Sequence, residues 1–271
     1  MLNRNIHIFK QPRIVTKLAY KLVRNLIAQD TTRYGLDLYG KYSLAELVRA
    51  ITEETSIPWI RLLYCYPDKI TDELVYELKN NDRLVKYMDI PIQHISDKIL
   101  SRMNRHGNSK LIREAVSLLR REVPGIVLRT TAMVGFPGED EEDFEKLCEF
   151  VKEARFDRFG AFTYSKEEGT AAALLDGEID EQTAQDRYDV LMQTQLTVAE
   201  ELSHSHIGEE LTVLTEGFDT VAEVYYGRSY RDAPDVDGRV YFTSKRKLSA
   251  GEFVTVKVTE AMDYDLVGVV K

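Results

Sequence analysis

Short apolar runs alternate with amphipathic segments along most of the chain, and this alternation restricts the fold more than any other feature. Short apolar runs separated by segments of helical periodicity are typical of βα units around a parallel sheet. The predicted strands cover residues 22–28, 59–65, 87–92, 126–134 and 158–164. The predicted helices cover residues 43–54, 71–79, 97–103, 110–122, 139–154 and 180–206. The predicted fold class is therefore α/β, with parallel strands.

The pattern changes after Gly208, where short alternating strands replace the βα spacing. We expect these strands at residues 211–214, 221–226, 239–242 and 253–260, punctuated by glycines. Closing a small antiparallel sheet into a barrel removes its exposed edges. The sequence thus predicts an atypical N-terminal segment at residues 1–26, an α/β domain at 27–206 and a small all-β barrel at 207–271.

The overall composition disfavours several classes of protein. The net charge is −9 and the sequence pI is about 5.2, so the chain repels phosphate backbones and broad nucleic-acid binding is disfavoured. No stretch approaches the roughly 20 apolar residues that a membrane helix needs. The only two cysteines, Cys65 and Cys148, rule out a disulfide framework and suit a reducing compartment. We therefore expect a cytoplasmic protein that does not bind a membrane.

Polar residues follow the predicted strands, at the edge of the sheet where ligands bind in α/β proteins. Gln29 and Asp30 follow the first strand, and Gln93 and His94 end the third. Each pair also has a structural interpretation, the first as a turn and the histidine as a satisfied buried residue. Arg129 lies within the fourth strand, where a buried arginine requires an anionic partner. Its planar guanidinium group suits the carboxylate of an amino-acid-like ligand.

Five segments resemble one enzyme family in their amino-acid sequences and in their order along the chain. They read AQDTTRYGLDLYG, DIPIQHISDKIL, RTTAMVGFPGEDEEDF, FDRFGAFTYSKEEGT and GRSYRDAPDVDG. Together they are similar to the radical S-adenosylmethionine (SAM) methylthiotransferases, and most similar to the RimO branch of that family. The resemblance runs from about Ile27 to the end of the chain.

The resemblance implies a fold, cofactors and a substrate. It implies a partial, TIM-like radical SAM barrel followed by a small all-β TRAM barrel. Complete family members use SAM and 4Fe-4S clusters, and the RimO branch adds a methylthio group to an aspartate of the twelfth small-subunit ribosomal protein. A related branch modifies an adenosine of transfer RNA. By this resemblance six residues would line the SAM pocket: Gln29, Asp30, Gln93, His94, Arg129 and Thr131.

Charge favours one of the two substrate classes. Residues 207–271 carry twelve acidic and eight basic side chains, a net charge of −4. A barrel that binds transfer RNA needs a basic surface, because neutralisation of the RNA phosphates by basic side chains dominates such binding. An acidic barrel better suits a basic ribosomal protein, so the sequence favours a protein partner and disfavours nucleic acid.

The cysteines of the family's cluster motif are missing. The resemblance places a CxxxCxxC motif upstream of the segment that corresponds to residues 22–28, but this chain has no cysteine before Cys65. We expect Cys65 and Cys148 to be packing residues, so no metal ligand is predicted. By the same resemblance we expect this chain to lack the N-terminal domain that carries the family's second cluster.

The start of the chain differs from the family. The first 28 residues hold six basic side chains and no acidic one, and residues before about Leu26 show no resemblance. A shifted reading frame or false start that rejoins the family sequence near Ile27 is one hypothesis, and a natural cluster-free paralogue is the other. The chain is then either an enzyme by family, inactive alone, or a non-catalytic module that binds the ribosomal protein. A transfer-RNA methylthiotransferase is the weaker third alternative.

Overall fold

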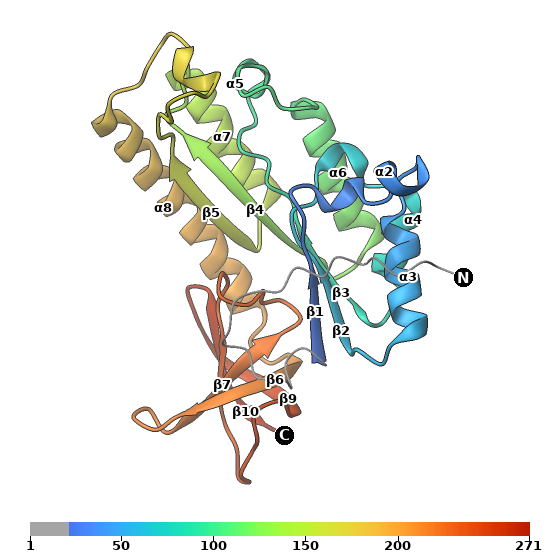
Figure 1. Ribbon diagram of the computed structural model, residues 1–271. Coiled ribbons are helices and arrows are strands. Elements are labelled where there is room, and N and C mark those ends of the chain that lie inside the picture. The colour runs from blue at the N-terminus through green and yellow to red at the C-terminus, as the bar shows by residue number, and fades with distance from the viewer. Residues whose placement is uncertain (1–21) are drawn as a thin grey trace.

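The computed structural model describes residues 22–271, and the basic segment predicted as atypical lies almost entirely outside them. The chain forms a five-stranded parallel sheet with helices, followed by a closed five-stranded barrel (Figure 1). The sheet strands, in chain order, are β1 (Val23–Leu26), β2 (Trp59–Leu62), β3 (Leu84–Asp89), β4 (Val127–Val134) and β5 (Arg158–Thr163). This parallel order with intervening helices confirms the predicted α/β class and partial barrel.

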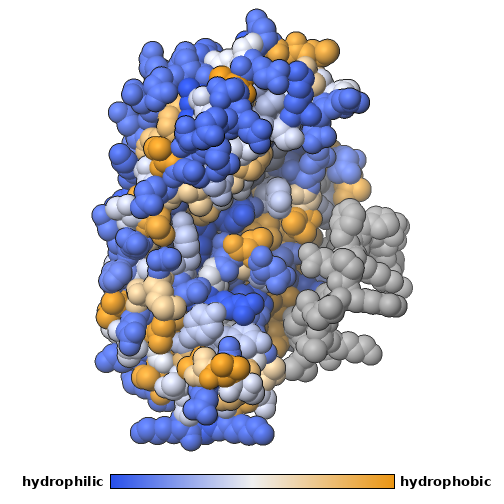
Figure 2. Space-filling view, turned by 90° about the vertical axis from the view of Figure 1, so that its left-hand side faces the viewer, coloured by the Kyte–Doolittle hydropathy of each residue, from blue (hydrophilic) through white to orange (hydrophobic). Residues whose placement is uncertain are grey.

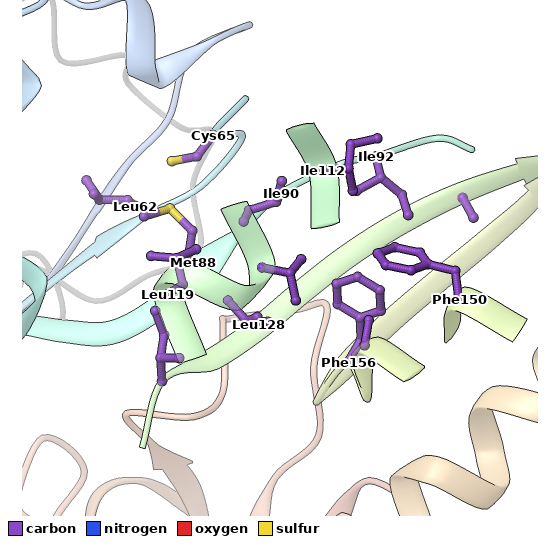
Figure 3. Close-up of a cluster of buried hydrophobic side chains, with 14 of the residues drawn as sticks. Leu62, Cys65, Met88, Ile90, Ile92, Ile112, Leu119, Leu128, Phe150 and Phe156 are labelled. Carbon is purple, nitrogen blue, oxygen red and sulfur yellow. The ribbon is translucent and has the colours of Figure 1, made fainter. Parts of the chain in front are cut away.

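Most of the helices cover one face of the sheet, whereas the short helix at residues 36–39 buries no side chain. The helices are α2 (Leu36–Tyr39), α3 (Leu44–Glu54), α4 (Asp72–Asn80), α5 (Asp97–Arg102), α6 (Ser109–Glu122), α7 (Glu141–Ala154) and α8 (Glu181–Ser205), with short 3-10 turns η1 (Thr31–Arg33), η2 (Pro67–Lys69) and η3 (Ala172–Leu174). Their apolar sides and the sheet enclose the main core, in which Met88, Leu128 and Phe150 are buried (Figure 3). The helices therefore leave the opposite face of the sheet to the second domain.

The barrel consists of β6 (Glu210–Asp219), β7 (Val224–Ser229), β8 (Val240–Thr243), β9 (Phe253–Met262) and β10 (Asp265–Val270). Strand β10 closes the barrel by pairing antiparallel with β9 and parallel with β8. Val213, Phe242 and Val256 are fully buried in its core. The predicted all-β barrel is confirmed, but the expectation of a purely antiparallel sheet is wrong at the β8–β10 pair.

Four strands differ from the prediction by several residues or more. Strand β6 extends to Asp219 and not to residue 214, and β7 covers residues 224–229 and not 221–226. The other two differences have a local cause. The third strand covers residues 84–89 and not 87–92, because Pro91 has no amide to donate and Gln93 has a left-handed φ of 68°. Strand β10 was not predicted, because Gly268 interrupts its apolar run. A Cβ at Gly268 would lie 2.4 Å from the Lys257 carbonyl oxygen, so only glycine fits this close strand pairing.

One loop of the barrel packs against the face of the sheet that the helices leave free. This barrel loop, residues 230–237, joins β7 to β8 and buries Ala233 beside Tyr87 and Val127. Arg61 on β2 is fully buried, and its Nη1 donates to the Tyr230 carbonyl oxygen over 3.0 Å. The two domains thus share a buried interface at which charged groups meet.

The side of the molecule that carries α8 has a mostly hydrophilic surface, with apolar side chains scattered among polar ones (Figure 2). Within residues 22–271, every helix is too short or too polar to cross a bilayer. This face therefore offers polar and charged groups, and no broad apolar band, to a partner.

Candidate functional site

A cavity of about 520 Å³ opens at the carboxyl ends of β1, β2 and β3. Residues that follow these strands form most of its wall, and an arginine beyond α5 completes it. The lining residues are Ile27, Ala28, Gln29, Tyr64, Tyr66, Pro91, Gln93 and Arg105. Its volume lies in the range of small-molecule sites, roughly 300–1,000 Å³. The cavity occupies the sheet edge at which the sequence predicts a ligand.

Gln93 lines this cavity and carries an unpaired side-chain acceptor. Its backbone is fixed on both sides, because its N–H donates to the Thr131 carbonyl oxygen over 2.9 Å and its own carbonyl oxygen accepts from the Met133 N–H over 2.7 Å. The side-chain Oε1 is buried and has no hydrogen-bond partner among the described residues. A buried acceptor without a partner is costly, which makes Gln93 a candidate for hydrogen bonding to a ligand.

Arg105 is the charged residue of the cavity wall. Its Nη1 donates to the Tyr66 hydroxyl oxygen over 2.8 Å, its Nη2 donates to the Pro91 carbonyl oxygen, and the guanidinium lies 4.4 Å from the centre of the Tyr66 ring. Sequence reasoning missed Arg105 because it follows a helix and not a strand. Tyr66 directly follows the second predicted strand, so the strand-end rule could have found it.

Gln29 and Asp30 have different surroundings. Gln29 is exposed and lines the cavity. Asp30 caps η1, because its Oδ1 accepts from the Thr32 N–H over 3.0 Å and its Oδ2 accepts from Arg33 Nε over 2.7 Å. Of this predicted pair, the structure therefore places only Gln29 on the cavity wall, while Asp30 supports the turn behind it.

His94 lies in a buried cluster away from the cavity wall. Its Nδ1 accepts from the Ser96 N–H over 2.9 Å, and its Nε2 lies 3.4 Å from Glu139 Oε2. Glu139 Oε1 also accepts from Arg187 Nη1 on α8 over 2.8 Å. His94 is completely buried and joins three segments of the chain, but its Nε2 has no hydrogen-bond partner among the described residues.

Arg129 and Thr131 lie on the face of β4 opposite the helices. Arg129 Nη1 donates to Asp89 Oδ1 over 2.7 Å, and Arg129 Nε lies 3.7 Å from Asp237 Oδ1 of the barrel loop. The anionic partner that the sequence requires is thus present, but the protein itself supplies it. Neither Arg129 nor Thr131 belongs to the cavity lining, so the structure brings together only Gln29 and Gln93 of the six predicted residues.

The two cysteines do not form a cluster site. Cys65 is fully buried, and burial raises its thiol pKa well above the ordinary value. Burial also raises the pKa of the half-buried Cys148 thiol to about 11. Among residues 22–271, no three histidine, cysteine or acidic side chains gather as metal ligands. Because a 4Fe-4S cluster requires several thiolates, the residues of this chain do not fit one.

Comparison with protein families divides the chain as the fold does. The radical SAM superfamily model matches residues 19–151, and the TRAM domain model matches residues 207–270. Among solved structures, coproporphyrinogen III oxidase from Escherichia coli, described as a radical SAM enzyme, is similar over 61% of this chain and 38% of its own. Its TM-score is 0.45 and its sequence identity 16%.

Several proteins that are longer than this chain share a much higher sequence identity with it than the solved structure does. The ribosomal protein uS12 methylthiotransferase RimO of Caldanaerobacter subterraneus subsp. tengcongensis is 52% identical over 254 residues, 93% of this chain and 58% of that protein. The RimO protein of Acetivibrio thermocellus is 51% identical over 243 residues, 90% of this chain and 54% of that protein. The chain belongs to the radical SAM methylthiotransferase family. As a methylthiotransferase homologue it resembles RimO, and it spans little more than half the length of these relatives.

Proposed function

We propose that this chain supplies the SAM-binding part of a methylthiotransferase that modifies an aspartate of ribosomal protein uS12. The substrate class comes from the names of the relatives. The observation that carries the proposal is the unpaired, buried Gln93 Oε1 in a cavity that also presents Arg105. A donor and an acceptor on one wall complement the carboxylate and amino groups of an amino-acid-like cofactor.

The residues of the cavity fit SAM as follows. Arg105 would bind the carboxylate, because a guanidinium matches a carboxylate in charge and geometry. Gln93 Oε1 would accept a hydrogen bond from the amino group, and Gln29 would contact the ligand at the exposed side. Bound SAM supplies an activated sulfonium group, which the surrounding wall would orient and shield from water. Cofactor contacts by Asp30, His94, Arg129 and Thr131 stay predictions.

We further infer that the chain is incomplete as a catalyst in the form given by its sequence. Its two cysteines are buried or half-buried and have raised pKa values, so they do not supply the thiolates of a cluster. The SAM-dependent reaction of the family would therefore require cluster ligands that this chain does not contain.

Charge supports a basic protein as the partner. Residues 165–205, which include the loop after β5 and α8, carry ten acidic and two basic side chains, a net charge of −8. One of these basic residues, Arg187, is buried against Glu139 and does not offset the surface charge. With the net charge of −4 in the barrel, this surface suits a basic ribosomal protein in the cytoplasm and disfavours transfer RNA.

Titration of the purified chain with SAM tests the cavity. Arg105→Met should weaken binding about tenfold or more, because a charge-assisted contact is lost. Arg49→Met is the matched control, because Arg49 is a half-exposed arginine of α3 that pairs with Glu77 of α4, and neither residue lines the cavity. Equal affinities of Arg105→Met and the original chain would contradict the proposed site. Capture of purified uS12 in preference to transfer RNA would support the partner, and the reverse preference would contradict it.

A further inference from the structure

Tyr64 stands in a strained backbone conformation on the cavity wall. Its φ is 56°, in the left-handed region that a bulky side chain rarely adopts. Two hydrogen bonds hold its backbone: the Tyr64 N–H donates to Asp89 Oδ2 over 3.0 Å, and its carbonyl oxygen accepts from the Thr31 N–H over 2.9 Å. A strained residue persists only where its surroundings fix it, and such residues cluster at ligand sites.

Asp89 holds Tyr64 with one oxygen and Arg129 with the other. Its side chain is almost completely buried at the end of β3, beside Arg129 on β4. Oδ2 accepts from the Tyr64 N–H, while Oδ1 accepts from Arg129 Nη1 over 2.7 Å. Because the carboxylate is rigid, the position of Arg129 determines how Asp89 faces the Tyr64 backbone.

The other side of the Arg129 guanidinium faces the barrel. Its Nε lies 3.7 Å from Asp237 Oδ1. Asp237 is fixed in turn, because its Oδ2 accepts from the Tyr87 hydroxyl over 2.6 Å and from the Ala233 N–H over 2.8 Å. A continuous chain of polar contacts therefore leads from the barrel loop to the cavity wall.

We propose that Asp237 and Arg129 are positioning residues, through which the barrel holds Tyr64 in its left-handed conformation beside the bound ligand. The barrel thereby becomes part of the ligand site, although the cavity lining comes from the sheet domain. This inference rests on the proposed function only for the identity of the ligand, SAM. Its structural part concerns the Tyr64 backbone and holds whichever small molecule the cavity binds.

The test compares two variants of the same loop in the full chain. Asp237→Asn removes the charge that faces Arg129 and keeps the shape of the side chain. Asp235→Asn is the matched control, because Asp235 lies exposed in the same loop and is not among the ion-pair partners of Asp89, Arg129 or Arg158. Hydrogen exchange at the Tyr64 amide, measured by NMR, reports the bond to Asp89 without any ligand. Titration with SAM reports the cavity.

We expect Asp237→Asn to accelerate exchange of the Tyr64 amide at least about tenfold and to weaken SAM binding, whereas Asp235→Asn changes neither more than about twofold. Equal acceleration in both variants, or none in either, would overturn the inference, because the effect would then be general loosening or absent. Failure of the original chain to bind SAM would contradict the proposed function, while the exchange rates would still decide the positioning role.

Arg129→Lys gives a second test if Asp237→Asn does not fold. The lysine keeps the charge, but its single ammonium group cannot contact both carboxylates. We expect the same faster exchange at the Tyr64 amide as in Asp237→Asn. If Arg129→Lys weakens SAM binding and leaves this amide protected, Arg129 contacts the cofactor directly and the positioning role is wrong.

Discussion

Arg158 on β5 donates to Asp232 of the barrel loop over 2.5 Å, and both side chains are almost completely buried at the domain interface. Removing one partner of a buried ion pair leaves the other charge without compensation. We therefore predict that Arg158→Met lowers the free energy of unfolding by about 3 kcal/mol, measured by denaturant titration.

The exposed pair of Arg246 and Glu252 in the barrel provides the control for this prediction. Arg246→Met should change the free energy of unfolding by no more than about 0.5 kcal/mol, because solvent screens an exposed pair. Similar losses for Arg158→Met and Arg246→Met would show that the buried pair does not stabilise the interface.

Asp237 should make stability depend on pH. Burial raises the pKa of its carboxyl group above the ordinary value of 3.8, although the hydrogen bond from Tyr87 opposes this shift. The folded chain therefore holds the proton more tightly than the unfolded chain. The stabilisation is fully present below the unfolded pKa and is lost as pH rises through the folded pKa.

Unfolding of the original chain and of Asp237→Asn, followed over a series of pH values, measures this effect. The free energy of unfolding of the original chain, relative to the variant, should fall as pH rises from about 3.8. A relative stability that rises over the same range would contradict the direction of the shift.

Lys98 should control the titration of Asp140 at the start of α7. The hydrogen bond from Lys98 Nζ, 2.6 Å from Asp140 Oδ2, together with the Asp143 N–H, lowers the pKa of Asp140 to about 2. Lys98→Met should move this pKa toward 3.8, as measured by NMR titration. Lys146→Met, which breaks the neighbouring pair with Glu142, should leave Asp140 nearly unchanged.

Both thiols should react slowly with alkylating reagents. Because burial raises the pKa of Cys148 to about 11, few of its side chains are thiolates near pH 8. We expect iodoacetamide to modify Cys148 about a hundredfold more slowly than a cysteine in an unstructured peptide, and Cys65 more slowly still. Rapid modification of either thiol, followed by mass spectrometry of the folded chain, would contradict the described burial.

Periodicity predicts most of the fold because buried strands and amphipathic helices differ in period. It locates β2, β4 and β5 and the helices from α3 to α8 within a few residues. It fails at β10, where Gly268 weakens the strand signal although close pairing with Lys257 requires glycine. That requirement arises from a tertiary contact, which a local pattern does not contain.

The site is less predictable than the fold. The strand-end rule finds Gln29 and Gln93 because the carboxyl ends of parallel strands gather at one edge. It does not find Arg105, which reaches the cavity from beyond a helix. It also cannot show that Arg129 meets Asp237, since the two are distant in sequence and belong to different domains.

The iron and acid-labile sulfide content of this chain, measured after anaerobic reconstitution, tests most directly whether the chain binds a 4Fe-4S cluster. Essentially no stably bound iron is expected, because the two cysteines are protonated and do not gather with other ligands among residues 22–271. About one 4Fe-4S cluster per chain would contradict this expectation and would require a ligand set outside the residues described.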